Sequence, residues 1–302
     1  MRVNPFYISN LAGSLNQTQV SIQKLSAQVS SGVSINAPSD NPVGAGRNVL
    51  LASQIQRDDS FTETAASVTG QLQVSDSALG SVVSQLTTAI SLAMSANNGT
   101  MSESNVKSVS SQLAGILSEV QALANTSYQG QYLFAGSKTD TVPFTTSNAA
   151  SPGVTSYSGD SGVNNIELPN GQKIQLNVPG NQIFLGSGGN SVFGALNALI
   201  ADYSSGTVDI KQAAQDTANL NTALNYVSQQ RVTVDGSINQ LTAASQSIES
   251  EKTQLITAQT NLIQADLPTI STQLALAETR QTALINLIAQ LESATNSLFS
   301  KM

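Results

Sequence analysis

Both ends of the chain carry apolar residues in alternating steps of three and four, which is the spacing of a helical heptad stripe. The first stripe runs over residues 8–29 and the last over residues 270–298. Residues 8–29 contain a single charged side chain, Lys24, and residues 281–300 contain only Glu292. A helix in water normally carries charged side chains on its exposed face. The two stripes therefore predict helices whose outer faces pack against protein.

The apolar members of the two stripes are our candidate assembly interface. An antiparallel pairing of the two ends would bring the stripes together, but each is short and lacks supporting ion pairs. We expect both ends to be disordered in the free chain and to fold when they pack against other subunits. The alternative is that the stripes are ordinary core faces of a monomeric bundle. The candidate assembly residues are Ile8, Leu11, Leu15, Ile22, Leu25, Val29, Leu274, Leu284, Ile288, Leu291 and Leu298.

The composition excludes several kinds of catalytic and metal site. The 302 residues include no Cys and no His, which rules out the usual zinc sites, a thiol nucleophile and a Ser-His-Asp triad. The acidic residues form no calcium-binding loop motif, and we expect Asp58, Asp59, Glu249 and Glu251 to be solvated on helix surfaces. We predict no catalytic residue, no cofactor and no metal site, so the protein is not expected to be an enzyme.

The charge balance and the N-terminus limit the partners and the route of export. The net charge of −7 argues against binding to nucleic acid or to an anionic membrane surface. The first residues lack the apolar run of a secretory signal, and no window approaches the roughly 20 apolar residues of a membrane span. We expect no membrane insertion, and export without a cleaved signal peptide if the protein leaves the cell.

Proline and glycine divide the chain into helical and non-helical parts. Pro38 and Pro42 interrupt the first helix, and Ser39 or Asp40 is expected to cap the next one. Heptad spacing predicts long helices on both sides of a turn at 97–100, and another long helix that ends before Pro268. The glycine-rich segment between them predicts a hairpin at 164–178 and a short helix at 192–203.

These patterns predict a mainly α-helical protein with a small β-rich insert. Its architecture is expected to be a long antiparallel helical bundle or coiled coil in which the N- and C-terminal helices pair. Residues 1–42 and 267–302 would form a terminal domain, and residues 43–137 and 207–266 a helical domain. Residues 138–206 would form a β-rich insert.

Two stretches resemble a known protein family. The sequence SSGVSINAPSDNPVGAG, at 30–46, is similar to the turn between terminal helices in the bacterial flagellin superfamily. The sequence GQYLFAGSKTDTVPF, at 130–144, resembles the hook-associated protein 3 branch of that family more than flagellin itself. The chain departs from the family pattern at Asp40-Asn41, where the family carries an Asp-Asp pair, and its insert is short.

The resemblance implies a flagellin-like fold and a structural role at the junction between the flagellar hook and filament. It implies an extracellular location in the flagellum after type III export, with the terminal helices in an inner tubular layer. The implied partners are flagellin, a second hook-associated junction protein, further copies of this chain in a ring, and an export chaperone that holds the C-terminal helix. The alternatives are a flagellin filament subunit or another helical type III-secreted protein.

Overall fold

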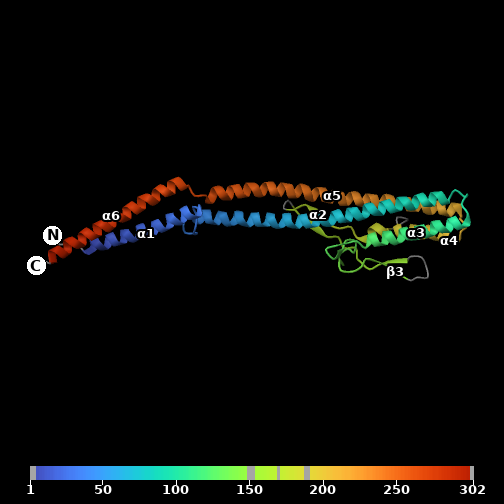
Figure 1. Cartoon of the computed structure of the whole chain (residues 1–302), viewed down its shortest axis with the longest axis horizontal. Coiled ribbons are helices and arrows are strands. Elements are labelled where there is room, and N and C mark those ends of the chain that lie inside the picture. The colour runs from blue at the N-terminus through green and yellow to red at the C-terminus, as the bar shows by residue number, and fades with distance from the viewer. Residues whose placement is uncertain (1–4, 148–153, 169–170, 187–190, 300–302) are drawn as a thin grey trace. The chain divides into compact units, whose positions relative to one another are not determined.

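The computed structural model describes residues 5–147, 154–168, 171–186 and 191–299 (Figure 1). The chain divides into two compact units, of which unit 1 contains residues 1–59 and 249–302 and unit 2 contains residues 60–248. The predicted mainly α-helical fold with a small β-rich insert is confirmed. The division into five sequence segments stays a prediction. The α-helices in the described part are α1 (Pro5–Ser31), α2 (Pro42–Ala96), α3 (Glu103–Ala124), α4 (Val192–Ser204), α5 (Ile210–Ile263) and α6 (Leu267–Phe299).

In unit 1, α1 lies antiparallel to α6, so the two ends of the chain come together (Figure 1). This confirms the predicted pairing of the terminal helices. The predicted interruption near Pro38 and Pro42 is also confirmed, because α1 ends at Ser31 and α2 begins at Pro42. Gly32 ends α1 with a backbone φ of +68°, a conformation that glycine adopts without a steric cost.

The residue that caps α2 is not the one predicted. The side chain of Asn41 accepts a hydrogen bond from the Gly44 backbone N–H at 2.9 Å, which makes Asn41 the N-terminal cap. The prediction of Ser39 or Asp40 was wrong because Asn41 directly precedes Pro42, and proline favours the first helical position. The Asp40 carboxylate instead accepts hydrogen bonds from the backbone N–H groups of the preceding loop.

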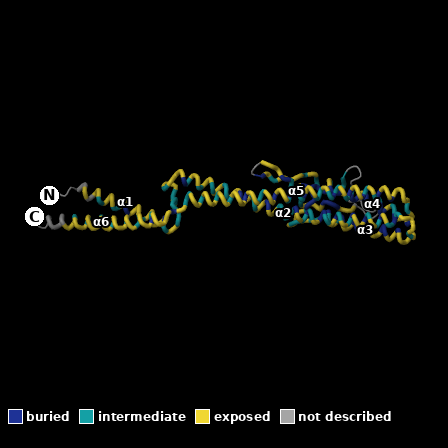
Figure 2. Tube along the Cα trace, turned by 90° about the horizontal axis from the view of Figure 1, so that it is seen from above, coloured by how far each residue is buried: buried dark blue, intermediate teal, exposed yellow. Residues whose placement is uncertain are grey.

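Unit 2 holds most of the buried side chains of the described part (Figure 2). Its core lies between α2, α3, α4 and α5, and the residues that the heptad spacing singled out are largely buried there. Tyr203 of α4 is fully buried, and its hydroxyl donates to the Asn97 side-chain oxygen at 2.8 Å. Core residues include Leu72, Leu79, Leu86, Val109, Leu113, Val120, Leu199, Val227, Val234 and Leu241.

The β-rich part of unit 2 consists, among described residues, of short antiparallel pairs. The predicted hairpin is confirmed by the β5–β6 pair, in which Ile166 lies opposite Ile174. Phe144 begins β3 and packs against three other aromatic rings with centroids 5.1 to 5.3 Å away. The elements are β1 (Ser127–Tyr128), β2 (Gln131–Tyr132), β3 (Phe144–Ser147), β4 (Val154–Tyr157), β5 (Asn165–Glu167), β6 (Lys173–Gln175) and the π-helix η1 (Asn181–Leu185).

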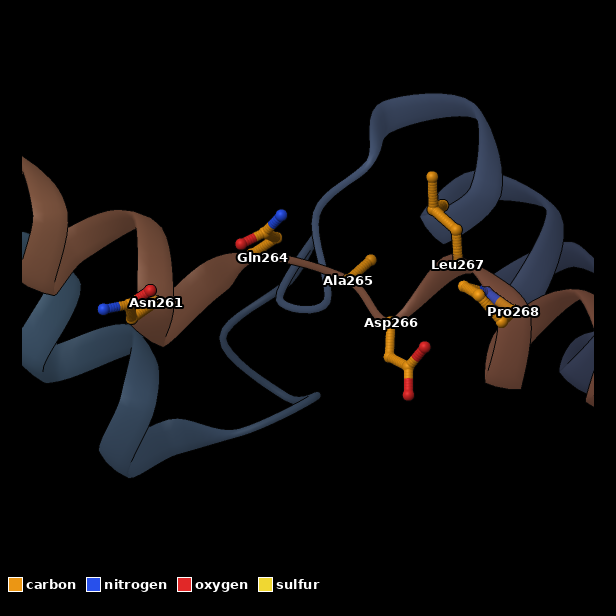
Figure 3. A pocket seen from close by; sticks show the side chains of 6 residues that line it. All are labelled: Asn261, Gln264, Ala265, Asp266, Leu267 and Pro268. Carbon is orange, nitrogen blue, oxygen red and sulfur yellow. The ribbon is translucent and has the colours of Figure 1, made fainter.

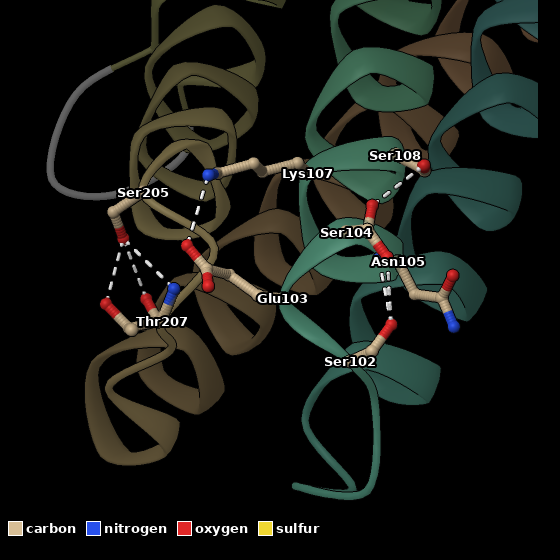
Figure 4. Close-up of polar contacts among 8 residues, drawn as sticks. All are labelled: Ser102, Glu103, Ser104, Asn105, Lys107, Ser108, Ser205 and Thr207. Carbon is tan, nitrogen blue, oxygen red and sulfur yellow. Dashed lines mark hydrogen bonds and ion pairs between the residues drawn. The ribbon is translucent and has the colours of Figure 1, made fainter.

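The turn predicted near residues 97–100 is confirmed between α2 and α3. Ser102 caps α3 by accepting a hydrogen bond from the Asn105 backbone N–H at 3.4 Å, and Lys107 forms an ion pair with Glu103 at 3.1 Å (Figure 4). Gly206 lies beside these residues with a φ of +85°, and a side chain there would collide with Glu103. The link between α4 and α5 therefore requires glycine at this position.

One helix departs from the expectation about membrane spans. An 18-residue window of α2 reaches a mean hydropathy of 1.3, so length and composition alone would allow this helix to cross a membrane. One third of that window is buried in the protein. Core helices of soluble domains reach the same hydropathy, and α2 contributes many of the buried leucines and valines of unit 2.

Candidate assembly interface

The predicted assembly residues lie along the contact between α1 and α6. On both helices the side chains at the stripe positions are half-buried, whereas most of their neighbours are exposed. Thr18 and Ile270, at two further stripe positions, are buried. The side chains of Ile8 and Leu298 lie outside the described part. The half-buried residues are Leu11, Leu15, Ile22, Leu25, Val29, Leu274, Leu284, Ile288 and Leu291.

A pair of helices cannot cover an apolar stripe from all sides. The stripe side chains contact the partner helix on one side and remain partly open to water on the other. The structure thus brings these residues together within one chain, and their part in contacts between chains stays a prediction. The expected disorder of both ends in the free chain also stays a prediction.

The terminal helices expose a second set of apolar side chains that the sequence analysis missed. Val20 of α1 and Leu276 of α6 are each 59% exposed, and Ile285 and Leu287 of α6 are also exposed. These residues lie off the heptad stripe. Single apolar residues on a surface are common, so the sequence alone gave no reason to select them.

Several hydroxyl groups of α1 and α6 donate hydrogen bonds within their own helices. Thr18 and Ser21 donate to the carbonyl oxygens four residues earlier at 2.8 and 2.9 Å. Thr272, Thr279 and Thr282 do the same on α6. Burying these hydroxyl groups against another protein leaves their donors satisfied, which lowers the usual cost of burying polar groups.

A shallow groove of about 500 Å³ runs between α1 and α6. Among the described residues that line it, Arg280 is the only charged one, and the others are polar or apolar side chains without a nucleophile–base pair. Among the described residues, no cluster of three or more acidic side chains is placed to hold a metal ion. The groove residues are Ser14, Gln17, Thr18, Ser21, Ala277, Arg280 and Leu284.

The breaks between α1 and α2 and between α5 and α6 meet and are hydrogen-bonded to each other. We call residues 32–41 and 263–266 the joint. The Ser34 amide donates to the Ile263 carbonyl oxygen at 2.6 Å, and the Ala265 amide donates to the Gly32 carbonyl oxygen at 3.0 Å. These bonds run between backbone groups, so the heptad pattern could not predict them.

Charge and capping fix both sides of the joint. Lys24 of α1 forms an ion pair with Asp40 at 2.9 Å, and this contact holds the pKa of the Asp40 carboxyl below its usual value. Asp266 directly precedes α6 and caps it by accepting a hydrogen bond from the Thr269 backbone N–H at 3.4 Å. A pocket of about 440 Å³ lies there (Figure 3), lined by Asn261, Gln264, Ala265, Asp266, Leu267 and Pro268.

The carboxylates that the sequence analysis placed on solvated surfaces gather between α2 and α5. Lys252 contacts Asp59 at 2.7 Å and Glu249 at 3.6 Å. Asp58 is buried, and burial raises the pKa of its carboxyl, with Glu251 adding to the shift. The expectation of solvation was therefore wrong for Asp58, because α5 covers that face of α2. The cluster links the two helices through a lysine.

Comparison with known proteins gives a family match in the N-terminal half of the chain. Residues 6–139 match the family described as the bacterial flagellin N-terminal helical region. The flagellar hook-associated protein 3 of Salmonella typhimurium is 32% identical over 139 residues, and that of Escherichia coli is 34% identical over 143 residues. Each match covers 46% of this chain and 44% of the relative, so less than half of each relative is spanned.

Solved structures match over a larger part of the fold. A flagellar hook-associated protein of Vibrio parahaemolyticus has a TM-score of 0.67 at 18% identity, covering 74% of this chain and 100% of that one. Hook-associated protein 3 of Legionella pneumophila has a TM-score of 0.62 at 15% identity, covering 70% and 98%. Residues 6–139 are thus similar to the bacterial flagellin N-terminal helical region, and the fold is similar to that of the solved hook-associated proteins.

Proposed function

We propose that this protein is a structural subunit of the bacterial flagellum that forms the junction between hook and filament. The observation that carries the proposal is the pair of terminal helices, which are poor in charge and half-buried against each other. The names of the similar hook-associated proteins 3 support the same role. None of these names denotes a catalytic activity, in keeping with a protein that is not an enzyme.

Assembly would be driven by covering the apolar stripes and outer apolar residues of α1 and α6. Each Å² of apolar surface removed from water contributes about 25 cal/mol. Outer faces with few charges suit contacts between identical copies, because any charge on a shared face would recur at every neighbour. Exposed hydroxyl groups such as those of Ser21 and Thr272 already donate within their own helices, so close packing leaves these donors satisfied.

The proposed setting follows the family resemblance. Residues 1–42 and 267–302 would form the inner layer of the tube, residues 43–137 and 207–266 the surrounding helical domain, and residues 138–206 the outermost part. The partners would be flagellin on one side, a second hook-associated junction protein on the other, and further copies of this chain in a ring. An export chaperone would hold α6 before type III export, which would require no cleaved signal peptide.

A flagellin filament subunit is the second candidate, because the matching family region carries the flagellin name. The fold matches and the curated relatives favour the junction role, since both carry the name of hook-associated proteins. Another helical type III-secreted protein is the remaining alternative. The three candidates differ in what a cell without the gene would lose.

The test is to delete the gene, inspect the cells by electron microscopy and assay the medium for flagellin. Hooks without filaments, together with flagellin monomers in the medium, are the expected result for a junction subunit. Hooks without filaments and a medium free of flagellin would identify the filament subunit instead. Normal filaments and normal swimming would overturn a flagellar role of either kind.

A further inference from the structure

A second apolar surface that is not covered within the chain lies in unit 1, on the parts of α2 and α5 that adjoin the joint. We define the collar as residues 42–56 of α2 and 253–262 of α5. Within the collar Gly44 is the only buried residue, although the stretch carries leucines and isoleucines at heptad spacing. Val43, Val49 and Leu50 are 67 to 70% exposed. Two helices without a buried core and with this much exposed apolar surface leave a face that another protein can cover.

The collar carries a single charged side chain. Arg47 is that residue, and residues 253–262 contain none. Arg47 lines a groove of about 330 Å³ together with Leu50, Leu51, Ala258 and Leu262. Within the described ranges, no carboxylate lies at ion-pair distance from Arg47. A guanidinium that lies among leucines is complementary to a partner with an apolar surface and one carboxylate.

A flank of α6 has the matching chemistry. Glu278, Ile285 and Glu292 recur every seven residues and therefore share one side of the helix. Both glutamates are exposed, Ile285 is 49% exposed, and neither glutamate takes part in an ion pair within the described part of the chain. An isoleucine between two carboxylates complements an arginine between leucines in both charge and polarity.

We propose that the collar is a docking surface for helix α6 of a second copy of this chain, in which Arg47 forms an ion pair with Glu278 or Glu292 of that copy. Within its own chain α6 uses its heptad stripe against α1, which leaves this flank for a neighbour. The inference rests on the proposed ring of copies at the junction and adds a contact outside the terminal helix pair. A head-to-tail contact of this kind, collar on α6, closes into a ring when the rotation between neighbours allows it.

The first test uses charge exchange in cells that produce the variants in place of the native protein. Arg47→Glu alone, and either Glu278→Arg or Glu292→Arg alone, are expected to lower the amount of this protein in purified flagella at least tenfold. The double variant Arg47→Glu with Glu278→Arg, or Arg47→Glu with Glu292→Arg, is expected to restore it. Lys211→Glu, an exposed cation in unit 2, is the matched control and should assemble normally. Circular dichroism of the purified variants checks that they fold.

The second test identifies what lies on the collar. Leu50, which is 70% exposed, is replaced by a photo-crosslinking amino acid, and the same replacement at Val232 of unit 2, 69% exposed, is the control. Irradiated flagella should give a product of twice the chain mass whose linkage maps to residues 267–293 of a second copy. Capture of a different protein, capture of another segment, or failure of both double variants to restore assembly would overturn the proposal.

The two proposals fail in different ways. If the native chain is absent from purified flagella, the junction role is wrong and the collar contact falls with it. If the native chain is present but Arg47→Glu assembles as well as Lys211→Glu, the junction role stands and the collar contact is wrong. The charge-exchange result also decides the matter when the crosslinking variant itself does not enter the flagellum.

Discussion

Ser34 donates two hydrogen bonds to one acceptor, the carbonyl oxygen of Ile263, although the two residues are 229 positions apart in the sequence. The backbone amide lies at 2.6 Å from this oxygen and the hydroxyl at 2.9 Å. The loop after α1 is thereby fixed to the last turn of α5. Both breaks in the long helices are consequently held at one place.

Two substitutions at Ser34 test the contributions of its two hydrogen bonds separately. Ser34→Ala removes the hydroxyl and should cost about 1 kcal/mol, whereas Ser34→Pro removes both donors and should open the joint. Hydrogen–deuterium exchange at the Ala265 amide, which is bonded to Gly32, measures this opening. Exchange should be much faster in the proline variant than in the alanine variant. Equal protection in both would show that the Ser34 bonds do not hold the joint.

Charged substitutions on the α1–α6 seam test assembly through the terminal helices. Leu15→Asp on α1 or Ile288→Asp on α6 places a carboxylate among half-buried apolar side chains. Each should leave the melting transition of unit 2 unchanged and prevent incorporation into the flagellum, because an unpaired charge cannot be buried there. Thr87→Asp, on an exposed face of unit 2, is the control. Normal incorporation of both seam variants would contradict the role of the terminal helices.

The ion pair between Arg231 and Asp76 joins α5 to α2 inside unit 2. The guanidinium meets both carboxylate oxygens, with Nε–Oδ1 and Nη2–Oδ2 distances of 2.5 and 3.1 Å. Lysine cannot reproduce this two-point contact, so Arg231→Lys should lower the free energy of unfolding by about 0.5–1 kcal/mol, a range set by the partial exposure of both groups. Urea unfolding measures the loss, and Asp76→Asn should abolish the difference between Arg and Lys. A loss that persists without Asp76 would point to packing instead.

The carboxyl of Asp202 gives unit 2 a pH dependence. Burial raises its pKa to about 6, and the neighbouring carboxylates of Asp216 and Asp209 add to the shift. The folded chain binds this proton more tightly than the unfolded chain does. The Asp202 carboxyl therefore stabilises the folded state most below a pH of about 4, and this contribution is lost as the pH rises through 6.

Asp202→Asn keeps a hydrogen-bond donor toward Asp216 but removes the titration. It should raise the stability of unit 2 by roughly 1 kcal/mol at neutral pH, allowing for solvent screening, and change it little near pH 4. Thermal melting of both proteins at the two pH values measures the difference. A gain of the same size at both values would mean that charge is not the cause.

Phe144 is the centre of the aromatic cluster under the β-rich part. Its ring contacts Tyr157, Phe184 and Phe193, and its side chain is 1% exposed. Phe144→Ala should cost about 3–5 kcal/mol through lost contacts and a cavity. Val142→Ala, at an exposed position two residues earlier, should cost far less. A small loss of stability in Phe144→Ala would show that the neighbouring aromatic rings move into the cavity left by the Phe144 ring.

Heptad spacing predicted the helices and their buried faces well because burial in a bundle follows the period of the helix. Val227, Val234 and Leu241 recur every seven residues and are buried in α5 as expected. Arg231 is a charged residue that lies between Val227 and Val234 on the same helix. Its partner Asp76 lies 155 residues away, and only the fold reveals the pair.

The parts that were missed depend on distances in space. Asp58 is buried because α5 lies across it, which no local pattern records. Asn41 caps α2 through a choice among three neighbouring polar residues that local preferences barely distinguish. Val20 and Leu276 are apolar positions off the stripe, and their exposure becomes informative only after the seam between α1 and α6 is known.

The pairing of α1 with α6 also sets an order in time. Ser31 ends the first helix and Leu267 begins the last, so a ribosome that adds about 5–20 residues per second needs some tens of seconds to supply the partner of α1. During that interval unit 2 has all of its sequence before α6 exists. Helix α1 is thus among the last helices to pack. Until α6 has been synthesised, the apolar stripe of α1 lacks its intramolecular partner.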